Sequence, residues 1–176
     1  MLENINLDTL KASFHDLSVS DLNTSLRVMS VCARGLYAGG CLYVNIVEVP
    51  ANLQNKPLTA LQNWRYSSKK AEGALADVHS VSSLAAASSY LLTRNTDRSD
   101  WPLLIAALVG ELVDPVLMIF VSSLEKELRS KEIVEKKDDD YVVQQLHKWN
   151  SFQKLKTIFA VGTFGFMLYR VATGPS

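Results

Sequence analysis

Two long segments with very few charged side chains constrain the fold of this chain most strongly. Residues 101–124 contain only Glu111 and Asp114 as charged residues, and residues 152–171 are apolar apart from a few cations near their ends. Each has about the 20 residues that a helix needs to cross roughly 30 Å of hydrocarbon. Soluble helices usually show one apolar stripe, whereas these segments are apolar on nearly every side. They therefore predict membrane spans, with a soluble helical bundle as the alternative.

Two further segments complete the predicted membrane domain. Residues 26–49 are mostly apolar and precede Pro50, where a helix is expected to end because the proline ring clashes with the preceding turn. Residues 74–93 are rich in Ala and Ser and less hydrophobic. The predicted fold class is all-α, a four-helix transmembrane bundle over residues 26–176. Its expected spans are about 26–49, 74–93, 101–124 and 152–171, the third starting at Trp101-Pro102.

An N-terminal segment, residues 1–25, is predicted to be separate from these spans. Leu7, Leu10, Phe14 and Leu17 recur at three- and four-residue spacing among polar neighbours. This spacing is typical of an amphipathic helix on a membrane surface or on the bundle, and a frayed polar leader is the alternative. Acidic residues in this segment argue against a mitochondrial transit peptide.

The connections between the predicted spans differ in positive charge. Residues 50–73 and 125–148 are expected to be polar loops, and residues 94–100 a short turn. Most Lys and Arg residues outside the spans lie in or beside the two longer loops. Because Lys and Arg are enriched on the cytoplasmic side, both termini are predicted to face away from the cytoplasm or its equivalent. The basic residues counted on the loop side are Lys56, Arg65, Lys69, Lys70, Lys126, Arg129, Lys131, Lys136, Lys137, Lys148, Lys154 and Lys156.

The composition excludes several classes of function. The chain has 18 basic and 18 acidic residues in 176, so no net charge favours nucleic acid as a partner. Cys32 and Cys41 are too far apart to form a disulfide within one continuous helix. Neither a metal-ligand spacing nor a phosphate-binding glycine loop is present in the sequence. The sequence therefore predicts no metal and no cofactor.

Ionisable residues at membrane depth are the most informative ones, because a charge there is costly and usually has a partner inside the bundle. Arg34 lies near the middle of the first span, and Glu111 and Asp114 lie near the middle of the third. We expect Arg34 to pair with one of the two acids. A structural salt bridge is one interpretation, and a second acid that is free to take up a proton is the other.

Further polar residues share faces of the first two spans. At 100° per residue, Tyr37, Asn45 and Glu48 lie on the same side of the first helix as Arg34. His79 lies in the second span, at a depth expected to match that of Asn45 and close to that of Glu48. His79 is either a hydrogen-bonded structural group or a base.

Two neighbouring stretches of the first predicted span carry a recognisable pattern: Gly35-Leu36-Tyr37-Ala38-Gly39-Gly40-Cys41-Leu42-Tyr43 and Val47-Glu48-Val49-Pro50-Ala51. This pattern resembles the first-helix signature of the anthrone-oxygenase-like family of small four-helix membrane proteins. Trp64 and Tyr66 before the second span, and Trp149 with Gln153 and Lys156 before the last, extend the resemblance over most of the chain. Val49 and Gln153 stand where many members have His, and Ser122 or Ser123 where Asn is common.

The resemblance implies cofactor-free oxidation of an anthrone to an anthraquinone by dioxygen. Such a reaction needs an apolar slot, a base and donors that hold the substrate anion. The candidates for the base are Glu48 and His79. The candidates for lining a slot that binds a flat aromatic or quinone-like molecule are Asn45, Trp64, Trp149 and Tyr37.

Two other functions remain open from the residues. A noncatalytic subunit of a larger membrane complex, or a scaffold for lipids or quinones, accounts for the histidines that differ from the family pattern. A transporter that uses Arg34, Glu111 and Asp114 would need more helices than four, and therefore oligomerisation. The expected partners are the lipid bilayer, an aromatic ligand, and other membrane proteins or further copies of the chain.

Overall fold

Helices make up nearly all of the residues that the structure describes. The structure is a computed structural model that describes residues 18–96, 99–136 and 138–173, and no strand occurs in these ranges. The all-α class is therefore confirmed. In chain order the elements are α2 (Val19–Tyr43), a π-helical segment η1 (Val44–Glu48), α3 (Val49–Leu53), α4 (Pro57–Thr93), α5 (Trp101–Arg129), α6 (Glu132–Lys136) and α7 (Asp139–Thr173).

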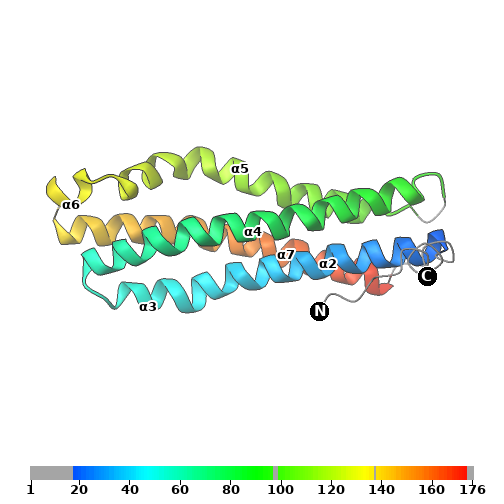
Figure 1. Cartoon of the computed structure of the whole chain (residues 1–176), viewed down its shortest axis with the longest axis horizontal. Coiled ribbons are helices and arrows are strands. Elements are labelled where there is room, and N and C mark those ends of the chain that lie inside the picture. The colour runs from blue at the N-terminus through cyan, green and yellow to red at the C-terminus, as the bar shows by residue number, and fades with distance from the viewer. Residues whose placement is uncertain (1–17, 97–98, 137, 174–176) are drawn as a thin grey trace, which may run out of the picture.

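The four long helices α2, α4, α5 and α7 run side by side (Figure 1). α2 packs mainly against α4 and α7, and α5 packs against the same two helices. Short α6 marks one end of the bundle, here called the α6 end. α2 begins, α4 connects to α5 and α7 finishes at the opposite end (Figure 1).

The first helix begins earlier than predicted, at Val19. Ser18 caps it, because its Oγ accepts a hydrogen bond from the backbone N–H of Asp21 at 3.1 Å. Residues 19–25 of the expected N-terminal segment therefore belong to α2. The rest of that segment, residues 1–17, lies outside the described residues.

Pro50 does not end the first helix, contrary to the sequence prediction. The turn just before it is a π-helix, in which the Val49 N–H donates to the carbonyl of Val44, five residues back. The wider π turn gives space to the proline ring, which would otherwise clash with the carbonyl four residues earlier. The helix then continues through α3 to Leu53.

Both predicted long loops are largely helical, so these two predictions are wrong. α4 begins at Pro57, a favourable first-turn proline, and only residues 54–56 connect it to α3. Within residues 125–148, α5 continues to Arg129 and α7 begins at Asp139. Asp138 caps α7 by accepting from the Tyr141 N–H at 2.9 Å. The charged residues of these segments do not prevent a helix from forming.

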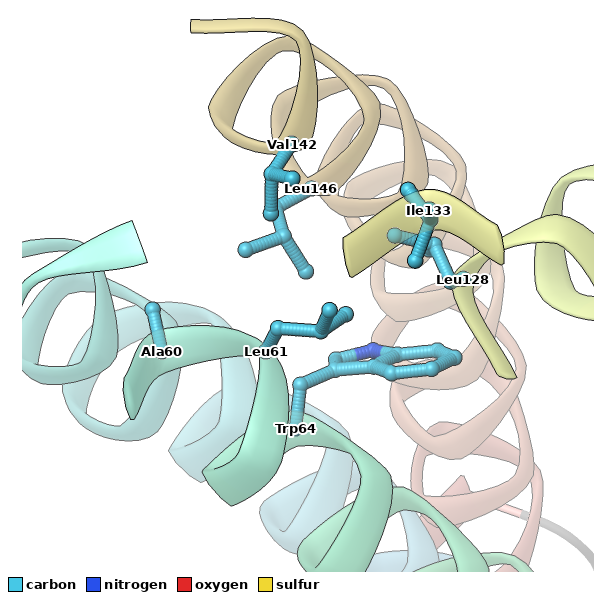
Figure 2. Packing of buried hydrophobic residues seen from close by; sticks show 7 residues of the cluster. All are labelled: Ala60, Leu61, Trp64, Leu128, Ile133, Val142 and Leu146. Atoms are coloured by element: carbon cyan, nitrogen blue, oxygen red, sulfur yellow. The ribbon is translucent and has the colours of Figure 1, made fainter. Parts of the chain in front are cut away.

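The helical extensions at the α6 end have a core of their own. Apolar side chains from α4, α5, α6 and α7 converge there (Figure 2). The Tyr141 hydroxyl also donates to Glu127 Oε1 at 2.5 Å, and this hydrogen bond raises the pKa of Tyr141. The α6 end is therefore built like a soluble bundle. The buried residues of this core are Ala60, Leu61, Trp64, Leu128, Ile133, Val142 and Leu146.

The rest of the bundle shows apolar residues outside and polar residues inside. Leu36, Leu84, Ile119 and Ile158, one on each long helix, are 68–74% exposed. By contrast, Arg34, Ser30, Ser82 and Ser89 are fully buried. Among the described helices, α5 and α7 are long and apolar enough to cross a membrane, and only 22% and 17% of their apolar windows are buried in the bundle.

Candidate functional site

Arg34 on α2 is fully buried in the middle of the bundle. Its Nη1 lies 2.9 Å from His79 Nδ1, and its Nη2 donates to Ser83 Oγ at 3.3 Å and to the carbonyl of Ala107 at 3.2 Å. These partners come from α4 and α5. The guanidinium therefore ties three helices together at one level.

His79 on α4 lies between Arg34 and Glu111. Its Nε2 is 3.2 Å from Glu111 Oε1 and 3.4 Å from Arg34 Nη1, which lies closer to Nδ1. A guanidinium only donates hydrogen bonds and an ionised carboxylate only accepts them. Nδ1 therefore accepts from Arg34, and Nε2 carries the ring proton on the nitrogen that lies near Glu111, although Glu111 Oε1 accepts no hydrogen bond among the described residues. His79 is then neutral, and its proton-accepting nitrogen is already occupied.

A second charge pair lies beside the first one. Lys156 Nζ on α7 is 2.9 Å from Asp114 Oδ2, which also accepts a hydrogen bond from the Tyr37 hydroxyl at 2.9 Å. The Tyr37 ring meets the His79 ring edge-on, with centroids 4.4 Å apart. Tyr37 therefore links the two pairs into one buried cluster.

The expected direct pair between Arg34 and an acid is not formed. Within the described part of the chain, neither Glu111 nor Asp114 lies within 4.0 Å of the guanidinium nitrogens. Arg34 contacts Glu111 only through His79, and Asp114 has its own cation in Lys156. Two cations thus lie close to the two acids, but Glu111 Oε1 and Asp114 Oδ1 are buried and accept no hydrogen bond among the described residues.

Lys156 is the residue that sequence reasoning misplaced. The sequence places it near the end of the last predicted span, among the basic residues beside the long loop. In the structure α7 begins at Asp139, 17 residues before Lys156, so Lys156 lies well inside the helix. Its position on the helix could have indicated an inward-facing side chain. Ala160, Thr163 and Met167 follow Lys156 at positions i+4, i+7 and i+11 on the same face of the helix, and all three are buried in the structure.

Next to the second pair lies a cavity of about 280 Å³. Its polar lining includes Asp114 and Lys156, and Glu48 from the π-helical segment. Trp149 and Phe152 of α7 and Met118 of α5 are among its apolar walls. Cavities of this kind, mostly apolar with a few placed polar groups, are typical of small-molecule sites.

Glu48 is the cavity carboxylate without a protein partner. Glu48 is half-buried, and no hydrogen bond or ion pair holds it within the described residues. The third acid in the lining, Glu125, accepts from Trp149 Nε1 at 3.1 Å. Glu48 is therefore the carboxylate of the cavity wall for which no protein partner is described.

The structure separates the remaining predicted site residues. His79 is level with Arg34, and Glu48 follows Arg34 by 14 residues along the first helix, which is about 21 Å. The expected common depth of His79, Asn45 and Glu48 is therefore wrong, because α4 extends much further toward the α6 end than the predicted span. Asn45 instead bonds α7, through the carbonyl of Gln153 at 3.2 Å and through Thr157 Oγ1.

The two tryptophans lie in adjoining regions. The Trp64 and Trp149 rings meet edge-on with centroids 5.5 Å apart. Trp64 is buried in the core of the α6 end, whereas Trp149 also lines the cavity. Trp149 and Glu48 thus line the same cavity, and Trp64 does not line it but packs against the Trp149 ring.

Gly110 on α5 is required by the buried guanidinium. A Cβ at this position would lie 2.3 Å from Arg34 Nη1 and 2.8 Å from its Cζ. We expect Gly110→Ala to displace the guanidinium and lower the free energy of unfolding by roughly 1–3 kcal/mol, as overpacking does elsewhere. Gly73→Ala on α4 is the control, since nothing lies within 4 Å of its Cβ. Equal stability of the two variants, measured by denaturant titration in mixed micelles, would contradict the close contact.

Among the described residues, no group of three or more His, Cys, Asp or Glu side chains is placed to hold a metal ion. The chain was also compared with known proteins. No family matches it, and no curated protein or solved structure matches it either.

Proposed function

We propose that the chain is a multi-pass membrane protein whose four long helices all cross the bilayer. The observation that supports this proposal is the inverted arrangement of side chains, with polar groups buried and large apolar residues exposed on every long helix. A soluble bundle would expose the polar groups instead. In lipid the apolar exterior is solvated, and the buried charges are paired as membrane charges usually are.

The lengths of the helices define how the bundle sits in the membrane. α4 has 37 residues and α7 has 35, which corresponds to roughly 50–55 Å at 1.5 Å per residue. The hydrocarbon is only about 30 Å thick. The α6 end, with its own core and its many Lys and Arg residues, therefore projects from the bilayer on the cytoplasmic or equivalent side.

We further propose that the cavity binds a flat aromatic molecule and promotes its oxidation by dioxygen, as the resemblance to anthrone oxygenases implies. Glu48 is the base, because its carboxylate has no protein partner and lines the cavity. His79 is a structural group, because Arg34 occupies its accepting nitrogen.

The proposed reaction needs no oxidant other than dioxygen. Glu48 accepts one proton from the acidic methylene of an anthrone, and the resulting anion transfers electrons to O2. One oxygen atom becomes the new carbonyl oxygen of the anthraquinone. The other oxygen leaves as water together with the two hydrogens of the former methylene.

The test is oxygen consumption by purified protein with anthrone and without added metal or flavin. We expect a rate above the uncatalysed background, with anthraquinone as the product. Ala71→Trp should abolish the excess rate because Ala71 lines the cavity, whereas Leu84→Trp on the exposed face of α4 should not change it. A background rate from well-folded wild-type protein would refute the oxygenase proposal.

A second candidate function, a noncatalytic subunit or scaffold, is favoured by one observation. Gly39 on α2 and Gly162 and Gly165 on α7 have no neighbouring atom within 4 Å of a Cβ position. Small residues that leave the backbone open are typical of faces where another membrane helix packs. Chemical cross-linking in native membranes followed by identification of the cross-linked chains tests this function.

A further inference from the structure

We propose that Lys156 binds the anionic oxygen of the ligand in the cavity, so that the ligand class is an aromatic molecule with an acidic hydroxyl or an enolisable carbonyl. This inference rests on the proposed ligand-binding function of the cavity. It adds the residue that recognises the ligand's charge, and it does not depend on whether oxidation follows.

Lys156 is the single cation in the lining of the cavity within the described residues. The charged side chains of this lining are Glu48, Asp114, Glu125 and Lys156. Arg34 is not part of the lining, and its side chain is fully buried among partners on three helices. A negative charge that develops on a bound molecule therefore has one cation to approach.

The ammonium group of Lys156 has more N–H donors than its contact with Asp114 uses. It carries three N–H bonds, of which Asp114 Oδ2 takes one. The Tyr37 ring lies 5.5 Å from Nζ on another side. The side chain remains 22% exposed, and it lines the cavity. At least one N–H is therefore available to an oxygen inside the cavity.

Pairing with Asp114 does not by itself require a cation in the wall of the cavity, because the whole pair could be replaced by apolar residues. A buried ion pair can often be replaced by apolar residues with no loss of stability, because desolvation offsets the attraction between the charges. The Tyr37 hydroxyl already donates to Asp114. By contrast, a cation near an apolar site strongly stabilises an enolate or phenolate, since the low dielectric strengthens the attraction.

The test uses 4-nitrophenol, whose phenolate absorbs visible light and whose ionisation can be followed at equilibrium. Binding is measured independently from quenching of tryptophan fluorescence, because Trp149 lines the cavity. An opposite charge within a few ångströms typically changes an ionisation constant tenfold or more. Because the carboxylates of the lining oppose this effect, it is measured as the difference between wild-type protein and a Lys156 variant. We expect the phenolate-to-phenol ratio of the bound probe to be about tenfold higher or more in wild-type protein.

Lys156→Met should remove this increase, and the matched variant Lys154→Met should keep it, because Lys154 is exposed on the same helix. Since Lys156→Met leaves Asp114 without its cation, Lys156→Met with Asp114→Asn provides a charge-balanced second variant with the same expected loss. An unchanged ratio in folded Lys156 variants, or no binding of the probe to wild-type protein, would overturn the inference. Because 4-nitrophenol does not serve as the oxidised substrate, this result is independent of the oxygen-consumption test.

Discussion

Glu48→Gln should lower the rate of oxygen consumption with anthrone by roughly 10²-fold or more, the usual loss when a general base is removed. The amide keeps the size of the carboxylate but does not accept the proton. Binding of a flat aromatic ligand should be nearly unchanged, because the apolar walls formed by Trp149 and Phe152 remain. The decrease is therefore expected in kcat and kcat/KM together, as for an interaction made in the transition state.

His79→Gln is the matched comparison for Glu48→Gln. His79 contacts Arg34 and Glu111 and does not line the cavity, so its replacement should lower stability more than the rate per folded molecule. The ratio of the two rates, each corrected for the folded fraction, is the quantity to measure. A larger loss in His79→Gln than in Glu48→Gln would refute the assignment of the base.

Arg34→Leu should be among the most destabilising substitutions in the chain, at roughly 3–5 kcal/mol, because it breaks a buried charge cluster from one side. The variant removes the donors to His79, Ser83 and the Ala107 carbonyl. Glu111 also loses the cation that it faces through His79. Unfolding by SDS in mixed micelles, followed by far-ultraviolet circular dichroism, measures the loss.

The Glu111→Gln substitution in the Arg34→Leu background should recover part of this loss, because it removes the unbalanced acid. A double-mutant cycle isolates the coupling between the two residues, which should be favourable by at least about 0.5 kcal/mol. Lys154→Leu is the control, since this exposed cation has no described ion pair. Strict additivity of Arg34→Leu and Glu111→Gln would show that His79 does not connect them.

The helical class and the positions of the apolar segments were predictable from the sequence. The expected start at Trp101-Pro102 is confirmed, because a proline in the first turn of a helix and a long apolar run both mark it. The helix ends at the α6 end were not predictable in the same way. Hydropathy indicates only where the apolar segment of a helix ends, and α4 and α7 continue beyond that point into the core of the α6 end.

The partners inside the bundle were only partly predictable. Helical periodicity identified Arg34, Tyr37 and the acids of α5 as inward-facing groups, because one face of a helix collects the polar residues. It could not determine which residues of neighbouring helices share a level. That level depends on the lengths of the connections between the helices. Because residues 50–73 were predicted to be a loop, His79 was predicted near the end of its helix, whereas in the structure it lies opposite Arg34.

Cysteine labelling with a membrane-impermeant maleimide tests the central claim, that the four long helices cross the bilayer, most directly. Single cysteines are introduced at exposed Ser18, Asn55, Thr96 and Asp138 in a Cys32→Ser/Cys41→Ala background, and vesicles of known orientation are labelled. We predict that Asn55 and Asp138 label from the cytoplasmic side and that Ser18 and Thr96 label from the other side. Labelling of Asn55 and Thr96 from the same side would contradict the four-span bundle.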